Sequence, residues 1–241
     1  MIFNQEENES PLHFDNLTIG YRKGRREVVV ASGLSATLER GKLTCLLGRN
    51  GTGKSTLLRT LAGLQPPLNP QFSTVNSQLS TLNCQLSTVN SQLSVALVLT
   101  QRPDLRNLTA EEVVGLGRTP HTNFWDTLRA DDRRIVAEAL QLVGIETLAN
   151  RPFETLSDGE QQKVMIAKAL AQQTPMIFLD EPTAFLDFIS RRELFTLLKR
   201  LAHDHGKAIL LTTHDLALAE EFADTTWLLD NGELQISRPQ K

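Results

Sequence analysis

The sequence of 241 residues predicts an α/β fold built on a mostly parallel sheet that is covered by helices. Short apolar runs at 176–179 and 208–212 alternate with segments of helical period at 159–172 and 191–203. A glycine-rich turn joins another apolar run, 43–47, to a helical segment that follows it. Strands that alternate with helices pair in parallel, because each helix returns the chain to the same edge of the sheet.

Two further regions are expected beside this sheet. Ahead of the glycine-rich turn, short β-like runs predict an N-terminal antiparallel β subdomain, with strands at 13–19, 27–31 and 34–38. Residues from about 104 to 172 predict a helical subdomain. Its first helix opens at Thr109, whose hydroxyl can cap the helix ahead of two glutamates. We expect these parts to form a single domain over residues 1–241.

The remaining strands have their own signals. An apolar run at 95–100 predicts a strand between the two subdomains. A hairpin is expected near the end of the chain, with strands at 227–229 and 234–236 around Asp230-Asn231-Gly232. Asn-Gly favours the tight turn whose twist matches two antiparallel strands.

Composition excludes several classes of protein. Apolar residues make up 40% of the chain, enough for a sizeable core, and the net charge of −3 argues against a broad nucleic-acid surface. Cys45 and Cys84 have no metal-ligand spacing and indicate no disulfide framework. The acidic first ten residues lack the apolar core of a signal peptide, and no stretch approaches the ~20 apolar residues of a membrane span. A cytoplasmic protein is expected, with any membrane role requiring a partner.

A heptapeptide repeat occupies residues 73–94. Its apolar positions follow a heptad spacing, which formally fits a coiled coil that binds a partner. The repeat is short, uncharged and rich in Ser, Thr and Asn, which are poor helix formers, so a low-complexity loop or weak strands is the simpler interpretation. We predict that residues 70–94 are poorly packed and expendable.

The glycine-rich turn has the full spacing of a phosphate-binding loop. Its glycines allow a tight turn that aims backbone N–H groups at an anion, and the following helix begins with its partial positive charge at the same point. Lys54 can pair with the β- and γ-phosphates of a nucleotide, and the hydroxyl of Ser55 can ligate Mg²⁺. The residues expected to contact ATP here are Gly48, Arg49, Asn50, Gly51, Thr52, Gly53, Lys54, Ser55 and Thr56.

Two acids end the apolar run 176–179. Asp180 can hold Mg²⁺ through water, and Glu181 can polarise the attacking water as a general base. Acids after a strand are also common at helix starts, but the phosphate loop upstream favours the catalytic interpretation.

A third motif is Leu156-Ser157-Asp158-Gly159-Glu160. Together with the two preceding motifs it resembles the signature sequence of ATP-binding-cassette (ABC) ATPases, normally Leu-Ser-Gly-Gly-Gln. The resemblance implies that Ser157, Asp158, Gly159 and Glu160 clasp the nucleotide bound by a second copy of the chain. Ser157 can also simply cap the helix, and both uses can coexist. Asp158 and Glu160 depart from the family pattern, and Asp158 adds negative charge near a phosphate site.

Further elements of that family follow in order. Tyr21 resembles the aromatic residue that stacks on adenine, and Gln101 resembles the glutamine that touches Mg²⁺ and the membrane partner, with Thr100 in place of the usual preceding proline. Asp187 matches the acid of the loop that crosses the dimer interface. His214 matches the switch histidine that bonds the γ-phosphate and holds the attacking water. The expected catalytic residues are therefore Lys54, Gln101, Glu181 and His214.

The resemblance spans about residues 12–237 and implies an ABC ATPase fold of the phosphate-loop NTPase class. The segment 113–121 resembles that of importers of iron–siderophore complexes, haem and cobalamin, although Gly-Arg-x-Pro also fits ordinary turn chemistry. The implied protein is an ATPase subunit at the cytoplasmic face of a bacterial inner membrane. The implied partners are a second copy, a transmembrane permease and, indirectly, a periplasmic substrate-binding protein, with ATP and Mg²⁺ as ligands.

Three alternatives stay open at the level of sequence. The chain could be a DNA-repair or ribosome-associated ATPase of the same class, although its acidic balance argues against nucleic-acid binding. It could energise an importer for another substrate, because the substrate pocket belongs to partner chains and no residue of this chain touches it. It could also be a nucleotide sensor without turnover, against which the intact Glu181 and His214 argue.

Overall fold

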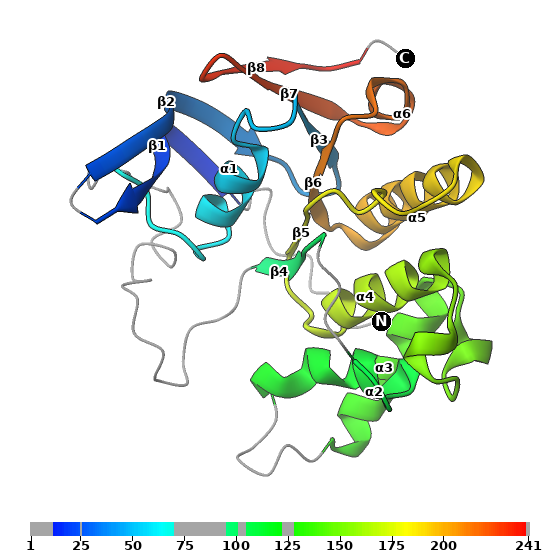
Figure 1. The fold of residues 1–241 in the computed structure, drawn as a ribbon. Helices are drawn as coiled ribbons and strands as arrows, with labels where there is room; N and C mark the ends of the chain where they lie inside the picture. The colour runs from blue at the N-terminus through cyan, green and yellow to red at the C-terminus, as the bar shows by residue number, and fades with distance from the viewer. Residues whose placement is uncertain (1–11, 25, 70–94, 101–104, 122–127, 240–241) are drawn as a thin grey trace.

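The computed structural model describes residues 12–24, 26–69, 95–100, 105–121 and 128–239. Within these residues a six-stranded sheet has the order β4-β5-β6-β3-β7-β8 (Figure 1). The neighbours from β4 to β7 pair in parallel, and β8 pairs antiparallel with β7, which confirms the mostly parallel sheet. The strands are β3 (Leu43–Leu47), β4 (Val95–Val98), β5 (Met176–Leu179), β6 (Ala208–Thr213), β7 (Thr225–Asp230) and β8 (Glu233–Ser237).

The N-terminal strands form a separate antiparallel pair, as expected. They are β1 (Leu12–Lys23) and β2 (Arg26–Leu38). The runs expected as two strands at 27–31 and 34–38 form one strand instead. The pairing shifts between Leu34 and Ala31, and the bulge contains Gly33 with a φ of 68°. Glycine adopts this left-handed conformation readily, so the chain bends without leaving the sheet.

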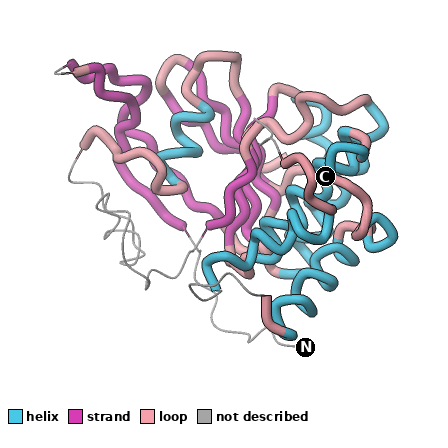
Figure 2. The backbone as a smooth tube through the Cα atoms, turned by 60° about the horizontal axis from the view of Figure 1, so that its bottom comes forward, coloured by secondary structure: helices cyan, strands magenta, loops and turns pink. Residues whose placement is uncertain are grey.

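Helices cover the sheet and form the helical region. Those beside the sheet are α1 (Lys54–Leu61), α5 (Phe188–His205) and α6 (Leu216–Phe222). The helical region contains α2 (Ala110–Gly115), α3 (Ala130–Leu142) and α4 (Asp158–Ala171), with 3₁₀ turns η1 (Leu116–His121), η2 (Glu146–Leu148) and η3 (Phe153–Thr155). Figure 2 shows the helical region gathered on one side of the strands, opposite the β1–β2 pair, whereas α1 packs on the same side of the sheet as that pair.

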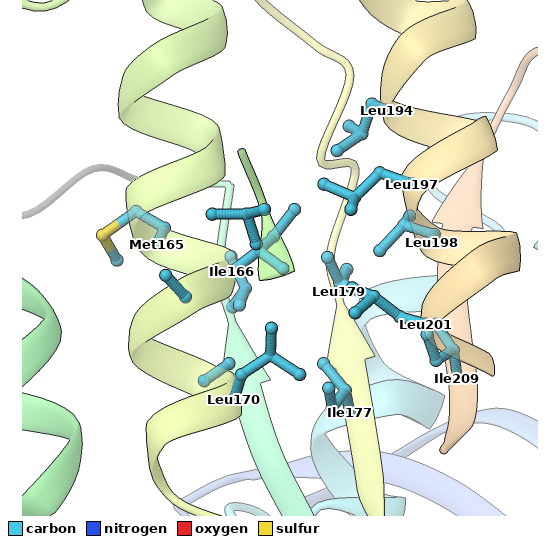
Figure 3. Packing of buried hydrophobic residues seen from close by; sticks show 14 of the residues in the cluster. Met165, Ile166, Leu170, Ile177, Leu179, Leu194, Leu197, Leu198, Leu201 and Ile209 are labelled. Atoms are coloured by element: carbon cyan, nitrogen blue, oxygen red, sulfur yellow. The ribbon is translucent and has the colours of Figure 1, made fainter. Parts of the chain in front are cut away.

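The sheet has a hydrophobic core on each face. In β5, Ile177 and Leu179 join the cluster that includes α4 and α5, whereas Met176 and Phe178 join the cluster beneath β1, β2 and α1. Figure 3 shows Ile177 and Leu179 between Ile166 and Leu170 of α4 and the leucines of α5. This alternation is the period-two pattern of a strand buried on both faces. The strand ends are therefore held firmly in place.

Several expectations differ from the structure in detail. The strand expected over 95–100 ends at Val98, and α6 had no counterpart among the expected helices. The hairpin turn is confirmed, because Asn231 and Gly232 both have positive φ, at 49° and 81°. The repeat at 73–94 and Gln101 lie outside the described residues. Among the described residues, no helix is both long and apolar enough for a membrane crossing.

Candidate active site

The phosphate loop lies between the fully buried strand β3 and helix α1. Gly51 and Gly53 have φ values of 85° and 106°, which other residues rarely adopt. A Cβ atom at Gly53 would lie 2.4 Å from Cγ1 of Val30, so the loop packs closely against β2. The N-terminal strand pair therefore supports the loop, and the N-terminus of α1 begins directly after it at Lys54.

Lys54 is 5% exposed although it is charged. Its Nζ donates hydrogen bonds to the carbonyl oxygens of Gly48 and Arg49 at 2.8 and 3.1 Å. The same Nζ lies 3.7 Å from Oε1 of Glu181. A buried ammonium group held by several oxygen atoms can exchange some of them for phosphate oxygens without a large movement.

Asp180 follows β5 and is 4% exposed. Its Oδ1 accepts hydrogen bonds from the hydroxyl of Ser55 at 2.9 Å and from the hydroxyl of Thr212 at 2.8 Å. A carboxylate and a hydroxyl this close together are hard oxygen donors of the kind that Mg²⁺ prefers. Within the described residues, no group of three or more His, Cys, Asp or Glu side chains could hold a metal. Asp180 and Ser55 fit part of the oxygen ligand set of such an ion.

Glu181 lies between two basic side chains. Its Oε1 faces Lys54, and its Oε2 lies 3.6 Å from Nδ1 of His214. The two residues meet because β5 and β6 are parallel neighbours, so Glu181 and His214 both follow carboxyl ends at one edge of the sheet. The side chain of Glu181 is 24% exposed and that of His214 is 55% exposed. Both groups are therefore accessible to a water molecule.

The signature residues start helix α4. Ser157 and Glu160 form a reciprocal cap: the backbone N–H and hydroxyl of Ser157 donate to Oε2 of Glu160 at 2.8 and 2.9 Å, and the N–H of Glu160 donates back to the hydroxyl at 3.3 Å. The N–H and then the hydroxyl of Ser157 lower the pKa of Glu160. Glu160, which departs from the family pattern, is thus an anion already bound at the helix start.

Asp187 caps the start of α5. Its carboxylate accepts the N–H of Ser190 at 3.0 Å and the hydroxyl of Ser190 at 2.8 Å. A Cβ atom at Gly159 would lie 3.6 Å from the hydroxyl of Ser190, and Lys163 pairs with Glu193 at 3.6 Å. The N-termini of α4 and α5 therefore lie side by side, which places Asp187 on the segment next to the signature residues.

The structure thus groups the sequence-predicted residues into two sets. The first set converges at the phosphate loop and consists of Lys54, Ser55, Asp180, Glu181 and His214. The signature residues and Asp187 gather at the paired helix starts. Tyr21 is 47% exposed and lies on β1, whose Ile19 would be 3.7 Å from a Cβ atom at Gly53. Gln101 lies outside the described residues.

Sequence reasoning gave no role to Thr212, and it noted Thr100 only as a replacement for proline. Thr212 is fully buried in β6, and its hydroxyl contacts both acids of the site. Thr100 donates its hydroxyl to the carbonyl oxygen of Asp180 at 2.6 Å. The sequence shows a hydroxyl residue near the end of each strand that flanks β5, but not the pairing order that brings both to Asp180 and Glu181.

A cavity of about 500 Å³ lies elsewhere, between α4 and α5. Its charged groups are already engaged: Arg192 pairs with Glu221 at 2.5 Å, and Arg200 donates to the carbonyl oxygen of Leu142 at 2.7 Å. We assign it no part in the chemistry, because the convergent acid and base groups surround the loop instead.

The fold and the loop together define a phosphate-loop nucleotide-binding protein. Comparison with known proteins narrows this class. The family model described as ABC transporter matches residues 31–184. The iron(3+)-hydroxamate import ATP-binding protein FhuC of Bacillus subtilis is 37% identical over 222 residues, covering 92% of this chain and 79% of the relative. The achromobactin transport ATP-binding protein CbrD of Dickeya dadantii is 37% identical over 212 residues, covering 86% and 74%.

A solved structure agrees with these relatives. The dimeric ABC transporter cassette MJ0796 superposes with a TM-score of 0.78 at 26% identity, covering 95% of this chain and 99% of the cassette. The chain therefore belongs to the ABC transporter family. Within that family it is an ATP-binding, ATP-hydrolysing subunit.

Proposed function

We propose that this chain is the ATPase subunit of a bacterial importer for iron–siderophore complexes, haem or cobalamin. The convergence of Lys54, Glu181 and His214 at the phosphate loop carries the ATPase part of the proposal. The substrate class rests on similarity to subunits that are named for iron(3+)-hydroxamate import and achromobactin transport. All three candidate substrates are bulky metal chelates.

Each residue has a distinct part in the proposed reaction. Glu181 accepts a proton from the attacking water, and its place beside Lys54 and His214 keeps it close to the γ-phosphate position. Lys54 and His214 stabilise the charge that grows on the phosphate oxygens. Ser55 and Asp180 would hold Mg²⁺, which neutralises phosphate charge when bound. Tyr21 would stack on adenine, and Gln101 would add a ligand to the metal.

The proposed assembly contains two copies arranged head to tail. ATP lies between residues 48–56 of one copy and residues 156–160 of the other, with Asp187 at the interface. The grouping of the site residues into two sets, and the dimeric form of the similar cassette, support this arrangement. We place the pair at the cytoplasmic face of the inner membrane, against a transmembrane permease that receives its cargo from a periplasmic binding protein.

Growth of a deletion strain tests the transport function. The strain is supplied with iron–siderophore complex, haem or cobalamin, each in turn as the limiting nutrient. We expect loss of growth on one of them, rescue by the wild-type gene and no rescue by Glu181→Gln at equal protein level. Normal growth on all three nutrients would contradict the proposed substrate class, although it would leave the ATPase activity standing.

A further inference from the structure

The peptide bond between Asp180 and Glu181 is held at both ends by threonine side chains. The hydroxyl of Thr100, just beyond β4, donates to the carbonyl oxygen of Asp180 at 2.6 Å. The N–H of Glu181 donates to the hydroxyl of Thr212 in β6 at 2.7 Å. Because β5 lies between β4 and β6, the two hydroxyls reach this peptide from opposite sides. Its oxygen and its N–H are both engaged, so the peptide plane cannot rotate freely.

The hydroxyl of Thr212 is itself oriented. Thr212 is fully buried, and its hydroxyl proton is donated to Oδ1 of Asp180 at 2.8 Å. A hydroxyl has one proton to donate and lone pairs to accept with. Donation to the Asp180 carboxylate therefore leaves the oxygen of Thr212 to accept the N–H of Glu181. One side chain thus contacts both acids of the site.

The held peptide precedes an unusual backbone conformation. Glu181 has a φ of 45°, in the left-handed region that side-chain-bearing residues rarely adopt. It also precedes Pro182, and a following proline biases a residue toward extended conformations. Such a conformation persists only where surrounding contacts impose it. The two threonine contacts act on the peptide whose rotation determines the direction of the Glu181 side chain.

We propose that Thr100 and Thr212 are positioning residues that hold the Asp180–Glu181 peptide and thereby direct the Glu181 carboxylate between Lys54 and His214. The inference rests on the proposed role of Glu181 as general base. Neither threonine is assigned a contact with the nucleotide. Loss of either hydroxyl is expected to slow turnover. Loss of the Thr100 hydroxyl should also leave ATP binding intact, because this hydroxyl bonds to the backbone of Asp180. Thr212, by contrast, also contacts the Asp180 oxygen that Ser55 bonds.

The first test compares steady-state ATP hydrolysis and ATP binding in the purified chain. We expect Thr212→Val and Thr100→Val to lower kcat by about 10- to 100-fold, the scale for a sub-ångström to 1 Å misplacement of a reacting group. The Kd of Thr100→Val for ATP should change by less than about threefold. Thr212→Ser keeps the hydroxyl and should stay near wild-type turnover. Thr44→Val is the matched control. Thr44 is buried in β3, where it pairs with Leu210 of β6, two residues before Thr212.

The second test repeats Thr100→Val in the Glu181→Gln background, with single-turnover hydrolysis as the readout. The contact of Thr100 described above is to the backbone, so its substitution should cost nothing further once the carboxylate is gone. Equal losses in both backgrounds would overturn the positioning role, as would a kcat for Thr100→Val equal to that of Thr44→Val. If Thr212→Val fails to fold, Thr212→Ser and Thr100→Val still test the positioning role, because Thr100 is only half-buried. Near-normal turnover of Glu181→Gln alone would instead refute the proposed general base.

Discussion

At the scale of single residues, Glu181 is held between an ammonium and an imidazole. Lys54 Nζ lies 3.7 Å from one of its oxygen atoms, and His214 Nδ1 lies 3.6 Å from the other. These distances exceed those of tight ion pairs, which leaves room for small changes of position when a phosphate group enters. Glu181 thus lies where the proposed reaction would create charge, and its side chain is accessible to water.

Replacement of Glu181 by Gln keeps the size of the side chain and removes its basicity. We expect turnover to fall at least ~10²-fold, the usual scale for loss of a general base, while ATP binding persists. Phosphate release and nucleotide binding measured on the same preparation check both parts. Glu138→Gln, at an exposed position on α3, provides the control for removal of one carboxylate. Turnover of Glu181→Gln within a few-fold of wild type would remove Glu181 from this role.

Much of this site follows from local sequence, because its parts occur in short motifs with fixed spacing. The phosphate loop places Lys54 and Ser55 at a helix start, and an apolar run ending in Asp180 and Glu181 places the acids at a strand end. The two threonines could not be inferred in this way. Their contacts join residues from three strands, and nothing in the sequence near Thr100 or Thr212 records the pairing order of the sheet.

At the scale of elements, η1 is fixed against the end of the signature helix α4. Nη1 of Arg118 donates to the carbonyl oxygen of Ala171 at 2.7 Å, and Nε donates to Asp132 at 2.9 Å. A Cβ atom at Gly117 would lie 2.2 Å from the carbonyl oxygen of Lys168, so this approach requires glycine. The Gly-Arg pair, which sequence resemblance linked to a class of importers, therefore has a structural function as well.

The buried pair of Arg118 and Asp132 yields a stability prediction. The N–H of Arg129, followed by the Arg118 guanidinium, lowers the pKa of Asp132, which is therefore charged at neutral pH. Arg118→Met leaves that charge buried without its partner and should lower the free energy of unfolding by about 3–5 kcal/mol. Arg134→Met removes the exposed pair with Glu138 and should cost under about 0.5 kcal/mol. Urea unfolding compares them, and equal losses would show that the buried pair is not stabilising.

The subdomains were predictable from their periodicity, whereas some boundaries were not. The bulge at Gly33 merges two expected strands into β2, because a left-handed glycine can continue a strand as well as end it. The short helix α6 was missed since seven residues give too little periodic signal. These features depend on pairing and packing partners that are distant in sequence.

At the scale of the whole molecule, one buried cation makes folding depend on pH. Lys207 precedes β6, is 7% exposed and donates to the carbonyl oxygen of Thr174 at 2.7 Å. Burial, and to a lesser extent Arg40, lowers the pKa of Lys207 from 10.5 to about 8. Between these two values the unfolded chain retains a proton that the folded chain has released. The free energy of unfolding therefore rises as pH increases from about 8 to 10.5.

Lys207→Met should remove this dependence. The contribution of Lys207 across the window is on the order of 3 kcal/mol, so the stability difference between wild type and variant should change with pH by about that amount. Urea unfolding at pH 7.5, 9 and 10.5 measures it. Lys23→Met, at an exposed position, controls for loss of a lysine. A constant difference between wild type and Lys207→Met at all three pH values would refute the lowered pKa.

In the proposed assembly, each nucleotide is shared by two copies of the chain. The phosphate loop of one copy would supply one half of the site, and the starts of α4 and α5 of the other copy would supply the second half. The mass of Glu181→Gln in solution, measured with and without Mg-ATP, tests this claim most directly. We predict a monomer without nucleotide and a dimer with saturating Mg-ATP. A protein that binds Mg-ATP yet remains monomeric at every concentration would contradict it.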